Sequence, residues 1–322
     1  MLTRASPALL ALALLFATVA FGQSAAQPRV AIVLFSTPQN EPNSSALVAG
    51  LRELGRIDGR NVALEYRFAG GQPERLRELA LETAASRPDV IVAFGGDVVP
   101  FVQQATRSIP IVMLTSNDPI ETRMIASYAH PGGNTTGVAF VSVETGAKRL
   151  QYLHEAAPAV ARVAVLWNPD HPDGEYRDIQ AAARTLGMQV ISLEVRRPED
   201  FDPAFDAAVQ ARAEALMVVS SRLMNVNRVR IYQWTVRQRI PLISGWGPWA
   251  ESGGLLSYGP DLDVLARRAA SQVDKILKGA RPGELPVEQP TRFELVVNLR
   301  AARELGIVVP PALVGRADRV VQ

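Results

Sequence analysis

The chain presents the same order of strand and helix patterns twice, and this repetition constrains the fold more than any other feature. Short runs rich in Val, Ile and Leu alternate with amphipathic helical patterns, which is typical of β-α-β units. The phrase RVAIVLF at 29–35 matches RVAVLW at 162–167, and RSIPIVML at 107–114 matches RQRIPLIS at 237–244. We therefore expect an α/β fold of two doubly wound parallel-sheet lobes with a ligand cleft between them.

The apolar runs locate five strands in each half. They lie at 29–36, 61–69, 89–96, 109–116 and 136–141, and then at 162–169, 188–195, 214–221, 240–246 and 253–259. These runs are continuous rather than alternating, which predicts sheets covered by helices on both faces. Helical spacing with start and stop signals predicts helices at 44–55, 73–87 and 261–283.

Composition excludes several classes of protein. The 34 Lys and Arg residues balance 32 Asp and Glu residues along the 322-residue chain, so no basic face for nucleic acid is expected. The absence of cysteine excludes disulfides, thiolate metal sites and cysteine nucleophiles. The three histidines, His130, His154 and His171, are widely separated, and we expect them on the surface. No cofactor or metal site is predicted.

The N-terminus has the layout of a secretory signal. Arg4 precedes an apolar run at 8–21, and small residues follow, with cleavage expected after Gly22 or Ala26. The apolar run is shorter than the roughly 20 residues that a membrane-spanning helix needs. No cysteine follows it for lipid attachment, so we expect a soluble periplasmic protein that is not a lipoprotein.

The candidate site lies where parallel strands end, because ligands of open α/β sheets bind beyond the carboxyl ends of the strands. The candidates are Phe35, Ser36, Gly96, Asp97, Ser116, Asp118 and Phe140 in the first half, and Asn168, Ser221, Arg222 and Trp246 in the second. Hydroxyl groups, backbone N–H groups and aromatic faces of this kind suit a polar small molecule.

Several of these candidates have a structural alternative. Asp118 before Pro119 is a natural helix start, and Asp97 can also cap a helix. Trp246 can pack at a hinge. Arg222 follows a buried strand and needs an anion, which is either a ligand carboxylate or an internal one. At the level of sequence these alternatives stay open.

Catalytic motifs are absent from the sequence. It has no glycine-rich phosphate loop, no Gly-x-Ser-x-Gly elbow, and no histidine beside a nucleophile. We therefore expect no enzyme activity. A secreted α/β hydrolase is the less favoured alternative.

Longer phrases resemble the ABC-transporter substrate-binding proteins of the tryptophan/tyrosine-binding type over nearly the whole mature chain. They include GLRELGRIDGRNVALEYRFAGGQPERLRELA at 50–80, HPGGNTTGVAF at 130–140, and the block from GGLLSYGPDLDVLARRAASQVDKILKGARPG to GIVVPPALVGRAD at 253–318. The resemblance implies a type I periplasmic binding fold that closes on a small-molecule ligand, with an ABC permease as partner. We expect a monomer. A ligand-sensing subunit that presents its closed form to a membrane sensor is an alternative function.

The resemblance also implies domain boundaries. A signal peptide at 1–26 is followed by an N-terminal lobe of 27–142 plus 254–284 and a C-terminal lobe of 143–253 plus 285–322.

Two departures from the family pattern concern the ligand. Family members commonly carry Gly-Thr-Pro after the third strand, whereas this chain has Gly95-Gly96-Asp97. After the third strand of the second lobe an Asp is common, whereas this chain has Ser221 followed by Arg222. Compared with the family pattern, an acidic residue is therefore missing from the second-lobe wall of the expected cleft and present, as Asp97, on the first-lobe wall. We therefore expect an anionic or zwitterionic ligand, amino acid-like or carboxylate-bearing, with Arg222 holding its carboxylate and Asp97 receiving an ammonium or hydroxyl group.

Overall fold

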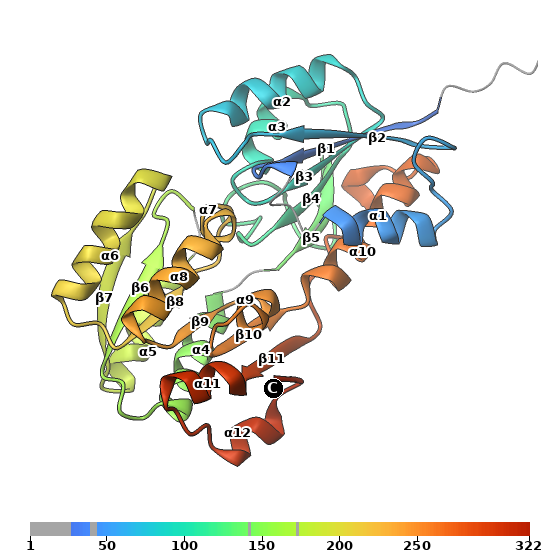
Figure 1. Ribbon diagram of the computed structural model, residues 1–322. Helices are drawn as coiled ribbons and strands as arrows, with labels where there is room; N and C mark the ends of the chain where they lie inside the picture. Colours follow the sequence, from blue (N-terminus) through green and yellow to red (C-terminus); the bar gives the residue numbers. More distant parts are fainter. Residues whose placement is uncertain (1–26, 39–43, 141–142, 172–173) are drawn as a thin grey trace, which may run out of the picture.

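The computed structural model describes residues 27–38, 44–140, 143–171 and 174–322. The expected signal peptide lies outside these residues. The described chain forms two α/β lobes, shown one above the other in Figure 1. Within the described ranges, no helix is both long enough and apolar enough to cross a membrane.

The first lobe is built on a parallel sheet that has five strands among the described residues, in the order β2-β1-β3-β4-β5. Its elements are β1 (Arg29–Leu34), α1 (Ser44–Glu53), β2 (Ala63–Phe68), α2 (Arg75–Ala85), β3 (Val90–Phe94), α3 (Val99–Ala105), β4 (Ile111–Thr115) and β5 (Thr135–Ala139). Strand β1, between β2 and β3, is buried on both faces: Ile32 and Leu34 pack in one apolar cluster and Ala31 and Val33 in another. This burial is the reason why its sequence is continuously apolar.

The second lobe is built on a sheet with seven strands in the described part of the chain, in the order β12-β11-β10-β9-β8-β6-β7. Its first elements are α4 (Val143–Ala156), β6 (Arg162–Trp167), α5 (Glu175–Thr185), β7 (Gln189–Glu194), a 3-10 turn (Pro198–Asp200), α6 (Phe201–Gln210), β8 (Ala215–Val218), α7 (Arg222–Val226), α8 (Arg228–Gln238), β9 (Leu242–Ser244), α9 (Gly247–Glu251) and β10 (Leu256–Pro260). The last elements of the lobe are β11 (Phe293–Asn298), α11 (Leu299–Leu305), α12 (Pro311–Arg316) and β12 (Arg319–Val321). All pairs in this sheet are parallel except β10 with β11.

Helix α10 (Leu262–Leu277), followed by a 3-10 turn (Pro282–Glu284), returns to the first lobe. Figure 1 shows α10 beside α1. The two helices pack closely at Gly50, where an added Cβ would lie 2.9 Å from the Cβ of Ala270. Asp274 adds an ion pair with Arg56, at 2.8 Å between Oδ1 and Nε.

The return to the first lobe occurs later than expected. We expected residues 254–284 to belong to the first lobe, but β10 at 256–260 pairs with β9 and β11 of the second sheet. The chain therefore crosses between Pro260 and Leu262. It crosses again between the 3-10 turn and β11, after Glu288 has formed a β-bridge with Val138 of the first sheet. The arrangement of two sheets and two lobes confirms the predicted fold class.

A buried ion pair supports the second lobe directly below the cleft. Arg149 of α4 and Glu175 of α5 are both fully buried and form a hydrogen-bonded ion pair. Arg149 also donates to the carbonyl oxygen of Tyr258 at 3.0 Å and to the hydroxyl of Thr145 at 2.7 Å. An added Cβ at Gly245 would lie 2.9 Å from Arg149 Nη2, so this arginine packs under the segment that carries Trp246.

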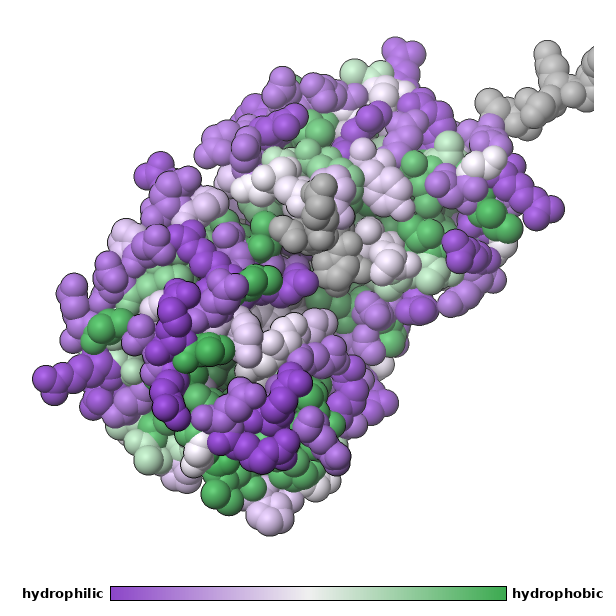
Figure 2. Space-filling model, in the orientation of Figure 1, coloured by the Kyte–Doolittle hydropathy of each residue, from purple (hydrophilic) through white to green (hydrophobic). Residues whose placement is uncertain are grey.

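The outer faces of both lobes carry mainly hydrophilic residues on the side shown in Figure 2, with scattered hydrophobic side chains between them. This agrees with the mixed charges of the sequence. Inside the molecule, one of the apolar clusters contains residues of both lobes.

Candidate ligand-binding site between the lobes

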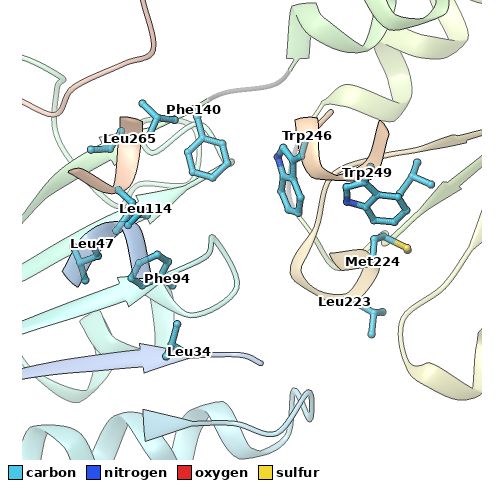
Figure 3. Close-up of a cluster of buried hydrophobic side chains, with 14 of the residues drawn as sticks. Leu34, Leu47, Phe94, Leu114, Phe140, Leu223, Met224, Trp246, Trp249 and Leu265 are labelled. Carbon is cyan, nitrogen blue, oxygen red and sulfur yellow. The ribbon is translucent and has the colours of Figure 1, made fainter. Parts of the chain in front are cut away.

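A cavity lies between the two lobes. Phe94, Gly95, Leu114, Ser116, Phe140, Leu262 and Leu265 line it from the first lobe and α10, and Arg222 and Trp246 line it from the second. Figure 3 shows Phe140 and Trp246 pointing toward one another from opposite lobes.

Strand ends position these side chains, as the sequence rule predicts. Phe94 is the last residue of β3, and Ser116 directly follows β4. Across the cavity, Arg222 is the first residue of α7, and the hydroxyl of Ser221 accepts a hydrogen bond from the Met224 backbone N–H at 3.3 Å. Trp246 lies at the start of α9. Both sheets therefore direct their carboxyl ends at one cavity.

Arg222 reaches from the second lobe to the end of β3 in the first. Its guanidinium carbon lies 5.4 Å from the centroid of the Phe94 ring, which allows a cation–π contact. Gly95 makes room for it, because an added Cβ would lie 2.9 Å from both Cγ and Nε of Arg222. Gly95 also has a φ of +111°, a conformation that residues with a side chain rarely adopt.

His171 joins the two lobes through hydrogen bonds at both ring nitrogens. Its Nδ1 lies 2.5 Å from Asp97 Oδ1, and its Nε2 lies 2.9 Å from Ser116 Oγ. The turn after β6 presents this ring, because the His171 N–H donates to the Asn168 carbonyl at 3.0 Å. The expectation of a surface position is therefore wrong for His171, whose side chain is only 2% exposed.

The same contacts determine the charge of Asp97. Burial alone would raise the pKa of this carboxyl group, but the charge and hydrogen bond of His171, together with the charge of Arg222, outweigh burial. The pKa of Asp97 is therefore below its ordinary value, and the carboxylate form is favoured.

Several buried polar groups near the cleft lack a hydrogen-bond partner among the described residues. They include the indole N–H of Trp246, which lines the cavity, and both polar atoms of the Asn117 amide. Asn117 fills the space beside Gly96, where an added Cβ would collide with its side chain. Buried polar groups are normally hydrogen-bonded, so an unpartnered donor on a cavity wall indicates a place for a ligand acceptor.

The remaining candidates do not line the described cavity, and their described contacts are hydrogen bonds within turns or packing inside a lobe. Asp118 Oδ1 accepts hydrogen bonds from the N–H groups of Ile120 and Glu121, at 2.8 and 3.2 Å. The helix expected after Asp118 is replaced by turns that end with Arg123 at a φ of +57°. Phe35 packs in a first-lobe cluster that does not include the aromatic residues of the cavity, and Ser36 is buried beside it. Asn168 accepts from the Asp170 N–H at 2.9 Å.

Of the predicted candidates, Ser116, Phe140, Arg222 and Trp246 line the cavity, and Asp97 is linked to it through His171. Sequence analysis missed Phe94 and Leu114, although both lie at the ends of predicted strands. It also missed Leu262 and Leu265, which reach the cavity because α10 crosses back at the cleft. No local sequence signal marks these two leucines.

The family of the chain follows from its sequence. The model of the ABC transporter substrate binding protein family matches residues 29–321, so the chain belongs to this family. It is a receptor that captures a small molecule between two lobes and delivers it to an ABC permease. Substrate-binding proteins of ABC importers act in the periplasm or outside the cell.

Known relatives agree with this assignment. The chain is 21% identical over 268 residues to a tyrosine-binding protein of Clostridioides difficile, covering 82% of this chain and 76% of the relative. A conserved domain protein of Vibrio cholerae has a similar structure, with a TM-score of 0.84 at 23% identity over 91% of this chain and 99% of the other. A Streptococcus domain in complex with L-Trp gives a TM-score of 0.83 at 20% identity, over 92% and 100% of the two chains.

The lowered pKa of Asp97 predicts a pH dependence for the closed form. The carboxylate stabilises this form fully above the ordinary aspartate pKa of about 3.9, and the stabilisation is lost as the pH falls through the lowered pKa. Thermal unfolding of the wild type and Asp97→Asn should therefore differ most at neutral pH and converge in acid. A difference in melting temperature that stays constant between neutral pH and about pH 2 would contradict this assignment.

Proposed function

We propose that the receptor binds an organic carboxylate with an apolar body in the interlobe cavity, using Arg222 for the carboxylate. The observation that supports this most is the position of Arg222, the charged residue in a cavity wall otherwise formed by apolar side chains, Gly95 and Ser116. A guanidinium fork suits a carboxylate, and its cost of burial is offset when an anion pairs with it.

The hydrogen-bonding groups of the wall favour the same ligand. Arg222 and the indole N–H of Trp246 can only donate, and Trp246 lacks an acceptor among the described residues. Carboxylate oxygens only accept, so they complement these donors. Two similar proteins, a tyrosine-binding protein and a domain in complex with L-Trp, also have ligands with a carboxylate and an aromatic body.

Closure of the two lobes is the proposed means of capture. The contacts of Arg222 with Phe94 and of His171 with Asp97 and Ser116 all join one lobe to the other. The segments that cross between the lobes can act as a hinge, as in other two-lobed receptors. The closed form, with its ligand enclosed, would be recognised by the permease. We propose that the receptor acts as a monomer.

We propose that the receptor is not an enzyme, although Ser116, His171 and Asp97 stand in the order of a catalytic triad. The expectation that no histidine lies beside a nucleophile holds for the sequence but not for the structure. An oxyanion hole is commonly formed by backbone N–H groups near the serine, and the Asn117 N–H already donates to Thr115 Oγ1 at 3.1 Å. Hydrolysis of p-nitrophenyl esters by the wild type that is lost in Ser116→Ala would contradict this proposal.

We propose periplasmic localisation after cleavage behind Gly22 or Ala26, without lipid attachment, from the signal layout and the absence of cysteine. Intact-mass measurement of the protein from its native host should show a mature chain that begins near residue 23 or 27. A full-length or lipid-modified mass would contradict this proposal.

Substitution of Arg222 tests the proposed function. Removing one partner of a buried charged contact costs about 2–5 kcal/mol, so Arg222→Ala should weaken carboxylate binding by at least roughly thirtyfold. Arg222→Lys should also lose affinity, because one ammonium cannot reproduce the planar fork. Isothermal titration calorimetry with a carboxylate found by thermal-shift screening measures both effects.

Arg237→Ala is the matched control, because Arg237 is an exposed arginine on the neighbouring helix α8 and should leave the affinity unchanged. An unchanged dissociation constant for Arg222→Ala would assign Arg222 to a structural role and overturn the proposed function.

A further inference from the structure

We infer that His171 is a specificity-determining residue: it occupies Asp97 and so directs the site toward aromatic carboxylates that lack an amine, in preference to α-amino acids. This inference rests on the proposed function, because it takes the binding of a carboxylate by Arg222 as given. It departs from the expectation from the sequence that Asp97 receives an ammonium or hydroxyl group of the ligand.

An enclosed α-ammonium group has strict requirements. It carries three N–H donors and no acceptor, and a buried charge of this kind is costly unless a carboxylate or several oxygen acceptors surround it. Among the described residues that line the cavity there is no Asp or Glu. Asp97, two residues after Gly95 of the wall, is the carboxylate that the structure connects to the cavity.

His171 already uses this carboxylate. His171 Nδ1 and Asp97 Oδ1 are within hydrogen-bond distance, at 2.5 Å, and hydrogen bonds to a carboxylate are stronger than those between neutral groups. The charge of Arg222 also acts on Asp97. An ammonium group that bonded to Asp97 Oδ1 would compete with the His171 ring, whose other nitrogen is bonded to Ser116 at 2.9 Å. The contacts that close the cleft thus compete with the recognition of an amine.

The shape of the wall defines the rest of the ligand. Phe140 and Trp246 face one another across the cavity (Figure 3), and Phe94 supports Arg222 at one end. An aromatic ring of the ligand can stack on aromatic faces such as those of Phe140 and Trp246. A short chain on that ring can carry the ligand carboxylate to the guanidinium of Arg222. These features together indicate arylalkanoic acids such as 3-phenylpropionate and indole-3-propionate.

Matched ligand pairs that differ only in the amine provide the test. The pairs are 3-phenylpropionate with L-phenylalanine, 3-(4-hydroxyphenyl)propionate with L-tyrosine, and indole-3-propionate with L-tryptophan. Isothermal titration calorimetry at pH 7 measures the ratio of the two dissociation constants within each pair. For the wild type, we expect the amine-free acid of at least one pair to bind at least tenfold more tightly.

The variant His171→Leu removes both ring nitrogens and so releases Asp97 Oδ1 from its hydrogen bond with His171. We expect the preference for the amine-free acid to fall at least tenfold in this variant. A general weakening of lobe closure would affect both members of a pair equally, so the ratio isolates specificity from stability. His130→Leu, which changes an exposed histidine, should leave the ratio unchanged.

The outcomes separate this inference from the proposed function. If the wild type binds the amino acids as tightly as the amine-free acids, or if His171→Leu keeps the wild-type ratio, the inference is overturned while carboxylate binding stands. If no member of any pair binds, the ligand class proposed here is rejected. If Arg222→Ala binds these acids as tightly as the wild type, the proposed function itself fails.

Discussion

The interaction on which the site depends is the set of hydrogen bonds that His171 makes across the cleft. One imidazole ring from the second lobe engages Asp97 and Ser116, which follow two neighbouring strands of the first lobe. Because both ring nitrogens are used, the ring connects the turn after β6 to the ends of both strands. The contact of Arg222 with Phe94 and the approach of Phe140 to Trp246 also lie between the two lobes.

This arrangement explains why polar and charged residues occur at buried strand ends. The side chain of Asp97 is only 20% exposed, and its negative charge is balanced by His171 and Arg222. Arg222 rests on the face of Phe94 and requires Gly95 beneath it. The second lobe contributes a further buried ion pair, Arg149 with Glu175, which supports the segment before Trp246. At the cleft, charged side chains are therefore stabilised by opposite charges, by an aromatic face and by a glycine that leaves room for them.

The fold was predictable from the sequence because its main signals are local. Continuous apolar runs locate strands, helical spacing and caps locate helices, and the repeated order predicts two lobes. Membership of β10 in the second sheet was not predictable, because a strand pattern does not name its neighbours. The antiparallel pairing of β11 with β10 was not predictable for the same reason.

The site was predictable only in part. Ser116, Phe140, Arg222 and Trp246 were found because strand ends are recognisable in the sequence. The pairing of Asp97 with His171 joins residues 74 positions apart, on different lobes, and no spacing rule connects them. Asp118 has a capping signal that the structure uses in a turn rather than in a helix.

The central claim is that the two lobes close on a carboxylate ligand. Small-angle X-ray scattering of the mature protein, with and without a saturating carboxylate ligand, tests this claim most directly. The account predicts that the radius of gyration decreases when the ligand is added to the wild type, and that the same concentration produces a smaller decrease with Arg222→Ala. A radius of gyration that does not change on addition of a ligand whose binding is established by calorimetry would contradict it.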